Sequence, residues 1–320
     1  MTTERGQTAN SPQDLPWRGW WDILQRTVKN MLEDNLSLIA AGVGFYFLLA
    51  VFPMLAALIS IYGLLVSPDD LQQQLSLLID IIPQQGREII QSQVGLIINK
   101  SHAALGTGAI ISTLFAVWSA SKGAQAMLTA CNITYGQKQQ RGFFMNLLMR
   151  VCLTIGAVLL LALTLFSIAL LPVLFTYLGL ENYRTLLVQW LAWPFLAVIF
   201  NLGLATFYRF GPYRHLAKWR WVTPGSIVAS LLWILFSFGF SIYLTQFAQY
   251  DKTYGSLGGV VVLLMWFYLS AYIILLGAEF NAAMEHQTTR DSTTGCEKEM
   301  GQRGAFVADT IPKDLQNNKR

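Results

Sequence analysis

The sequence predicts an all-α integral membrane protein, folded as a bundle of six transmembrane helices. Hydrophobic residues make up 54% of the 320-residue chain and charged residues only 12%, with a mean hydropathy of +0.44. Soluble domains carry about twice that share of charge. The apolar residues also come in long uncharged runs, the usual mark of helices that cross a hydrocarbon core of about 30 Å. This composition excludes an ordinary soluble enzyme, a disordered chain and a small disulfide scaffold.

The first predicted span follows a polar N-terminal segment. Residues 1–19 are expected to form a disordered cytoplasmic tail, and the transmembrane domain is expected to cover residues 20–284. The first apolar run, 36–66, has no charged residue and would make about 46 Å of helix. Because this exceeds the hydrocarbon thickness, the helix must tilt, kink or extend beyond the bilayer, and Pro53 is the expected place for a kink.

The segment 67–103 is predicted to form an extracytoplasmic amphipathic hairpin. Ser67-Pro68-Asp69-Asp70 has the pattern of a helix N-terminus, with a capping serine, a proline and acidic residues in the first turn. Apolar residues recur at helical spacing on both sides of a break at Pro83–Gly86. Neither half is apolar enough to span, so an interfacial position is expected.

Five further spans are predicted, at residues 105–121, 151–178, 186–208, 222–247 and 257–278. Small residues four apart, such as Gly225 and Ala229, predict close helix packing within the bundle. Residues 285–320 turn polar again and are expected to form a disordered cytoplasmic tail.

The distribution of positive charge predicts the orientation. With six spans, eighteen of the 22 Lys and Arg residues fall on the side that holds both termini and the loops 122–150 and 209–221. Cytoplasmic segments of bacterial inner-membrane proteins carry such an excess of Lys and Arg. Both termini are therefore expected in the cytoplasm, with the protein in the inner membrane.

Sequence motifs of enzyme chemistry are missing from the chain. It contains no Walker loop, no G-x-S-x-G elbow and no H-E-x-x-H helix. Its three histidines and three cysteines show neither metal-ligand spacing nor a disulfide framework. The loops 122–150 and 209–221 hold no Asp or Glu, the residues with which a nuclease would bind metal ions. We therefore expect no enzyme activity, no cofactor and no bound metal.

The loop 209–221 alternates basic and aromatic side chains. The first interpretation is an ordinary positive-inside loop with an aromatic belt. The second is a contact with anionic lipid head groups or another anionic substrate. Binding of RNA by phosphate contacts and base stacking is the least favoured, and no nucleic-acid partner is expected. The candidate head-group residues are Arg214, Lys218, Trp219, Arg220 and Trp221.

Polar residues at the predicted cytoplasmic ends of the spans form a second candidate site. Snorkelling or pairing between helices is the first explanation for such residues. Because polar groups are costly in lipid, a functional role is the second. In that interpretation they line a cytoplasm-facing vestibule, in which the acidic members pair with the basic ones and Asn201 lies deepest. The candidate substrate-binding residues are Glu33, Asp34, Asn35, Lys122, Asn132, Arg150, Asn201, Arg209, Glu279 and Asn281.

Four stretches between about Trp20 and Met284 resemble the YihY/BrkB family of bacterial inner-membrane proteins. They are Glu33-Asp34-Asn35 with Ala40–Tyr46 and Phe52-Pro53, Phe207–Pro212 with Trp219–Gly225, Tyr254–Gly258, and Leu276–Asn281. The resemblance implies six spans, in agreement with the apolar runs, and little chemistry. Members have been labelled ribonuclease BN, a label we regard as mistaken, or virulence and serum-resistance factors. Movement of lipids or lipid-like envelope precursors has also been linked to the family.

The function expected from the sequence is that of a transporter or translocation factor for an anionic amphiphile, such as a lipid or an envelope precursor. Membrane lipids with anionic head groups are the expected partners. The alternative is a non-transporting membrane scaffold that recruits envelope proteins through its tails, 1–35 and 285–320. A ribonuclease is the least favoured possibility.

Overall fold

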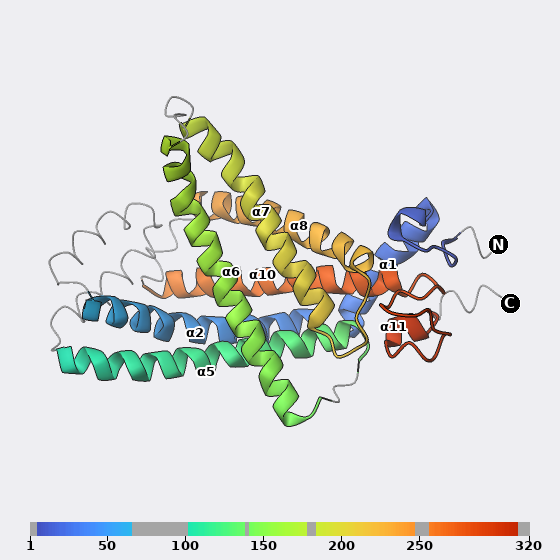
Figure 1. Ribbon diagram of the computed structural model, residues 1–320, viewed down its shortest axis with the longest axis horizontal. Coiled ribbons are helices and arrows are strands. Elements are labelled where there is room, and N and C mark those ends of the chain that lie inside the picture. The colour runs from blue at the N-terminus through green and yellow to red at the C-terminus, as the bar shows by residue number, and fades with distance from the viewer. Residues whose placement is uncertain (1–4, 66–101, 138–140, 178–183, 247–255, 313–320) are drawn as a thin grey trace. The chain divides into compact units, whose positions relative to one another are not determined.

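The computed structural model describes residues 5–65, 102–137, 141–177, 184–246 and 256–312 (Figure 1). Within these ranges the chain is helical, with no β-strand beyond an isolated bridge between Ala217 and Thr293. The predicted all-α class is confirmed. The elements are η2 (Pro12–Asp14), α1 (Trp17–Glu33), α2 (Leu36–Leu65), α5 (His102–Thr134), α6 (Phe143–Tyr177), α7 (Arg184–Phe210), α8 (Trp219–Gln246), α10 (Ser256–Glu285) and α11 (Phe306–Asp309).

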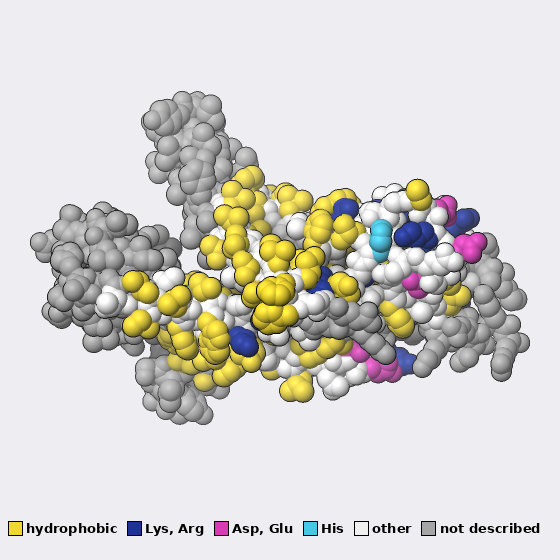
Figure 2. Space-filling model, turned by 60° about the horizontal axis from the view of Figure 1, so that its bottom comes forward, with side chains coloured by type: hydrophobic (Ala, Val, Ile, Leu, Met, Phe, Trp, Pro, Cys, Tyr) yellow, Lys and Arg dark blue, Asp and Glu magenta, His cyan; other side chains and the backbone are white. Residues whose placement is uncertain are grey.

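Four helices in the described part of the chain are long and apolar enough to cross a membrane. Their apolar segments are Leu36–Met54, Phe143–Leu160, Trp219–Leu244 and Gly258–Glu285, and a shorter apolar helix covers Pro194–Phe210. Figure 2 shows hydrophobic side chains over much of the visible surface, as expected of helices that face lipid. Most of the predicted hairpin 67–103 lies outside the described residues. The six-span count and the orientation therefore stay predictions.

The chain divides into two compact units. One contains the described residues of Met1–Ala40, Gln125–Ser237 and Tyr272–Arg320, and the other those of Ala41–Ala124 and Phe238–Ala271. In the second unit, α2, α5 and α10 run side by side (Figure 1). The α-carbon side of Gly44 faces the backbone of Tyr268, and Gly123 faces the ring of Phe47. Small residues thus let these helices approach one another closely.

In the first unit, α8 and α10 cross at a contact between two glycines. A Cβ atom added at Gly225 would collide with the carbonyl oxygen of Gly277. A Cβ atom at Gly277 would lie 2.6 Å from the Cβ atom of Ala229 and 2.6 Å from the hydroxyl of Tyr208. The close packing expected from the spacing of Gly225 and Ala229 is confirmed. This crossing holds the first turns of α8 against the last turns of α10.

The terminal segments differ from the sequence expectation of disordered tails. Residues 5–16 and 286–312, together called the terminal cap, hold buried residues such as Leu15, Thr288, Ser292 and Val307. A small hydrophobic cluster joins the cap to the helices; it contains Ala9, Leu15, Ile23, Trp221, Phe280, Ala283 and Met284. The expectation of disorder is therefore wrong for these residues. The polar side chains of the cap bind backbone groups, which composition alone does not reveal.

Replacement of Gly277 by alanine is expected to destabilise the protein. The added methyl group has no room at the α8–α10 crossing, and such overpacking costs about 1–3 kcal/mol. Gly156→Ala is the matched control, because nothing lies within 4 Å of a Cβ atom at that position of α6. We expect Gly277→Ala to lower the melting temperature of the detergent-solubilised protein, and Gly156→Ala to leave it unchanged or raise it. Equal melting temperatures for the two variants would contradict the close contact between α8 and α10 at Gly277.

Candidate functional site

The basic loop between α7 and α8 is bound to the terminal cap by its backbone. The N–H of His215 donates to the carbonyl of Gly304 at 3.0 Å. The N–H of Lys218 donates to the carbonyl of Ser292 at 2.9 Å. The ammonium group of Lys218 also donates to a backbone carbonyl, that of Asp291, at 2.8 Å. The cap therefore covers one side of this loop.

Arg214 points inward from the loop and is neutralised there. Its Nη1 atom lies 2.7 Å from Oε1 of Glu285, the last residue of α10, and both side chains are fully buried. The hydroxyl of Ser292 donates to the same carboxylate oxygen at 2.6 Å. The guanidinium also lies over the ring of Tyr135, 4.2 Å from its centroid, and burial raises the pKa of that phenol well above its ordinary value. Loss of one partner of such a buried pair costs about 3–5 kcal/mol.

Two polar side chains of α10 bind other helices. The side-chain oxygen of Asn281 accepts from the N–H of Gly225 at 2.7 Å, and its amide nitrogen donates to the carbonyl of Val222 at 2.8 Å. Glu279 is fully buried, and its Oε1 atom accepts from the amide of Asn30 in α1 at 2.7 Å. The Oε2 atom of Glu279 has no hydrogen-bond partner among the described residues. Asn281 thus joins α10 to α8, and Glu279 joins it to α1.

Other vestibule candidates also have partners of their own. The side-chain oxygen of Asn132 accepts from the N–H of Tyr213 at 2.6 Å. Asn201 donates to the hydroxyls of Ser226 and Ser230, at 3.2 and 3.4 Å. These contacts hold α5 against the loop and α7 against α8, which is the helix pairing that the first explanation of these residues expected.

The ion pair expected for Arg150 in the vestibule is wrong among the described residues of its unit. Arg150 donates to the side-chain oxygen of Gln125 at 2.9 Å. Lys122, which belongs to the second unit, lies 6.0 Å from the ring centroid of Trp118. Arg150 thus binds an uncharged amide in place of a carboxylate, and a pairing of Lys122 with an acidic candidate stays a prediction.

The acidic candidates at the end of α1 serve the turn into α2. Glu33 lies 3.6 Å from Lys29, one turn earlier, and both are exposed. Asp34 is the C-cap of α1, and burial, with the nearby charge of Glu33, raises its pKa. Asn35 has a positive φ of 52°, a conformation that asparagine tolerates better than most residues. A role in substrate binding for any vestibule candidate stays a prediction.

The exposed part of the predicted head-group loop lies at the junction of α7 and α8. The guanidinium of Arg209 lies 4.3 Å from the ring centroid of Trp219 and 5.5 Å from that of Phe210. The two rings meet edge to face at 6.4 Å and are 47% and 42% exposed. Arg220, the residue after Trp219, is also exposed. We call these four residues the Arg209–Trp219 patch.

Three members of the predicted head-group set differ from the patch, because the cap and the hydrophobic cluster enclose them. Arg214 is buried with Glu285, Trp221 is only 1% exposed, and Lys218 donates to the cap. Lys218 is half-buried against the cap, and for Arg214 and Trp221 a direct contact with lipid head groups does not fit the structure. Trp219 and Arg220 fit it, and Arg209 joins them from the vestibule set.

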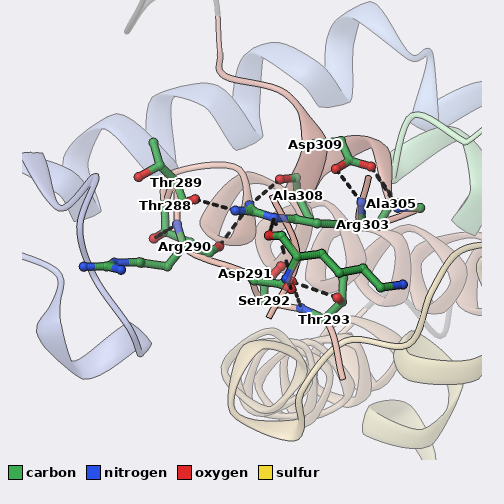
Figure 3. A network of polar contacts seen from close by, with 12 residues as sticks. Thr288, Thr289, Arg290, Asp291, Ser292, Thr293, Arg303, Ala305, Ala308 and Asp309 are labelled. Carbon is green, nitrogen blue, oxygen red and sulfur yellow. Dashed lines mark hydrogen bonds and ion pairs between the residues drawn. The ribbon is translucent and has the colours of Figure 1, made fainter. Parts of the chain in front are cut away.

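Arg303 holds the terminal cap together (Figure 3). Its buried guanidinium donates to four backbone carbonyls, those of Thr289, Arg290, Lys298 and Ala308, at 2.7–3.3 Å. The carboxylate of Asp309 accepts from the backbone N–H groups of Gly301, Arg303, Gly304 and Ala305. Separate turns of the cap are thus joined by two side chains, without a large apolar core.

The N-terminal half of the cap binds the residues that follow α10. The hydroxyl of Thr288 donates to the carbonyl of Ala9 at 2.6 Å, and the N–H of Thr289 to that of Gln7 at 2.8 Å. The side-chain amide of Gln287 donates to the carbonyl of Arg5 at 2.8 Å. These contacts join two segments that are 279 to 282 residues apart in the sequence.

Arg303→Lys is expected to loosen the cap. A lysine has three donors on one nitrogen and cannot reach four carbonyls arranged around a planar guanidinium. With each lost bond to a charged group worth about 1.5–3 kcal/mol, we expect a local loss of about 2–4 kcal/mol. A fluorophore on exposed Cys296, in a Cys152→Ser background, should then show lower anisotropy. Arg290→Lys, at an exposed arginine of the same cap, should leave the anisotropy unchanged.

The cap is also expected to loosen in acid. Burial acts to raise the pKa of Asp291, but hydrogen bonds from the N–H of Lys298 and from Thr293, with the charge of Arg303, outweigh it and hold this pKa below its ordinary value of 3.8. A lowered pKa means that the stabilisation is complete above the ordinary value and is lost as the pH falls below it.

The same Cys296 label tests this dependence on pH. Its anisotropy should be constant from neutral pH to about pH 4 and fall below that. In Asp291→Asn, which cannot ionise, the anisotropy should be low already at neutral pH and should change less in acid. An identical acid transition in both proteins would assign the transition to other groups.

Comparison with known proteins agrees with the membrane character of the fold. The family model described as Virulence factor BrkB matches residues 27–301. A putative ribonuclease-like protein, YfkH of Bacillus subtilis, is 32% identical over 254 residues, which cover 77% of this chain and 88% of that protein. A UPF0761 membrane protein of Psychromonas ingrahamii is 25% identical over 270 residues, or 83% of this chain and 89% of the relative.

A UPF0761 membrane protein of Xanthomonas oryzae pv. oryzae is 36% identical over a shorter region of 111 residues, 33% of this chain and 26% of that protein. No solved structure matches the chain. The family model covers the Arg209–Trp219 patch, the Arg214–Glu285 pair and the C-terminal part of α1. The chain therefore belongs to the Virulence factor BrkB family of bacterial membrane proteins, the family that its sequence motifs predicted.

Proposed function

We propose that the protein is an inner-membrane transporter or translocation factor for an anionic amphiphile, and that the Arg209–Trp219 patch receives its head group. The observation that carries this proposal is the patch itself. It places two arginines and two half-exposed aromatic rings at the ends of two apolar helices, α7 and α8. Aromatic rings and basic side chains are the groups that bind anionic lipids at a membrane surface.

The hydrogen-bonding state of Arg209 supports a phosphate-bearing ligand. Its Nε and Nη1 atoms are buried and have no hydrogen-bond partner among the described residues. An unsatisfied buried donor costs about 1–3 kcal/mol, so a ligand oxygen or a water molecule is favoured there. Arginine also suits phosphate oxygens geometrically, because its planar guanidinium donates two parallel hydrogen bonds. Arg220, exposed one residue after Trp219, supplies a second positive charge.

Any movement of the ligand across the membrane is proposed to be passive, ion-coupled or driven by a partner. The sequence holds no nucleotide-binding loop that would supply energy from ATP. In this proposal both termini lie in the cytoplasm, so the patch faces the inner leaflet, where the anionic head groups gather.

A scaffold is the second candidate function, and the ordered terminal cap favours it. The cap exposes a folded, charged surface that includes Glu297 and Glu299, and a protein partner could recognise such a surface. The double variant Glu297→Lys/Glu299→Lys separates the two functions. A scaffold should lose its partner, whereas lipid movement through the bundle should be unaffected.

A ribonuclease is not proposed, although one relative is named ribonuclease-like. Glu279 and Glu285, two carboxylates of the last turns of α10, are both fully buried. Glu285 is moreover paired with Arg214. Neither is accessible to an RNA substrate.

The proposal predicts head-group-dependent lipid movement that depends on the patch. In reconstituted vesicles, wild-type protein should move fluorescent phosphatidylglycerol across the bilayer faster than fluorescent phosphatidylcholine. Arg209→Gln/Arg220→Gln removes two positive charges, each worth about 1 kcal/mol near an anionic surface. The variant should therefore lose the preference, with an apparent affinity for phosphatidylglycerol lower by about tenfold or more.

Arg290→Gln is the matched control, because Arg290 is an exposed arginine of the terminal cap outside the patch. It should behave as the wild type does. Wild-type protein that moves neither lipid faster than empty vesicles would refute the transport proposal. Equal rates of phosphatidylglycerol movement in the wild type and the double variant would instead show that the patch does not take part in transport.

A further inference from the structure

The helix α1 has three distinct faces. Its packed face carries Gly19, Ile23, Arg26, Thr27 and Met31, all buried. On this face the ring of Trp20 stacks on that of Phe280, with centroids 6.1 Å apart. Arg26 donates to the carbonyl of Ala283 at 3.1 Å. The last turns of α10 therefore hold α1 in a fixed rotation about its axis.

A second face is apolar and exposed. Its side chains lie at intervals of three and four residues, so they form one stripe along the whole helix. They are all large, and each is about half exposed or more. The stripe consists of Trp17, Trp21, Leu24, Val28 and Leu32, with exposed fractions of 80%, 56%, 46%, 60% and 73%.

The third face is polar and lies between the other two. It presents Arg18, Gln25, Lys29 and Glu33 to the outside. The stripe is thus bordered by charged side chains on one edge and by the packed face on the other. A surface helix of a soluble protein would turn its apolar residues inward, whereas α1 turns one apolar face to α10 and another outward.

The exposed stripe is followed in sequence by the first apolar helix that is long enough to cross a membrane. Only Asp34 and Asn35 separate α1 from α2, whose apolar segment Leu36–Met54 can cross a membrane. Leu38, in the first turn of α2, is 76% exposed. Leu32 therefore lies within two turns, in sequence, of an apolar segment that can cross a membrane.

We propose that α1 is an interfacial helix and that its partner is the bilayer surface on the side from which α2 enters. The stripe enters the boundary between head groups and acyl chains, and Arg18 and Lys29 stay at the level of the phosphates. Two tryptophans near the start of the stripe fit this position, because indole rings favour the membrane interface. A 17-residue helix would lie along about 25 Å of that surface. This placement does not depend on the transport proposal.

Spin labels on the full-length protein test this placement. Single cysteines are introduced by Trp17→Cys, Leu24→Cys and Val28→Cys in the stripe, and by Gln25→Cys and Lys29→Cys on the polar face. The background replaces Cys131, Cys152 and Cys296, and each protein must melt as the parent does. The labelled proteins are reconstituted into vesicles of phosphatidylethanolamine and phosphatidylglycerol. Collision rates with oxygen and with a water-soluble nickel chelate are then measured.

We expect the ratio of oxygen to nickel collisions to be higher at all three stripe positions than at Gln25 and Lys29. The two polar-face labels serve as matched controls, because they lie on the same helix and differ only in direction. Stripe labels as accessible to nickel as those controls would overturn the proposal. Stripe labels shielded from both reagents, or broadened by labels on a second copy, would also overturn it, in favour of a protein partner.

Discussion

The buried ion pair between Arg214 and Glu285 is the interaction on which the first compact unit depends. It joins the α7–α8 loop to the end of α10, with Tyr135 stacked on one partner and Ser292 bonded to the other. Two buried charges are costly unless each is neutralised. The pair is therefore stable only while the loop, α5, α10 and the terminal cap are all in place, which makes these four parts interdependent.

The other polar residues near the helix ends also have hydrogen-bond partners of their own. Asn281 binds two backbone groups of α8, Asn132 binds the loop, and Asn201 binds two serine hydroxyls. A hydrogen bond satisfied between helices removes the cost of a polar group in an apolar setting. Glu279 is different, because only one of its two oxygens is satisfied within the described residues. A purely structural role therefore explains Glu279 less completely than it explains the three asparagines.

The sequence predicted the helical class and the close contact at Gly225, because they follow from apolar runs and from residue spacing, and it predicted the family through the resemblance of four motifs. The terminal cap was missed because Arg303 and Asp309 bind backbone groups, so their partners have no sequence signature. The α1 stripe was missed because charged residues lie between its members; its spacing, from Trp17 to Leu32, was the available signal. The head-group loop was predicted only in part. Arg214 and Arg220 are close in sequence, yet the loop turns one toward Glu285 while the first turn of α8 exposes the other.

The two membrane contacts proposed for this protein meet at one hydrophobic cluster. Ile23, on the packed face of α1, and Trp221, in the first turn of α8, are buried in the same cluster with Phe280 of α10. Trp219 and Arg220 of the patch immediately precede Trp221, so the cluster positions both the patch and α1. Close-packed side chains transmit small shifts instead of absorbing them. A lipid head group that displaced Trp219 would therefore also displace Trp221 and, through the cluster, Ile23. The position of α1 on the bilayer and the occupancy of the patch are therefore expected to be coupled.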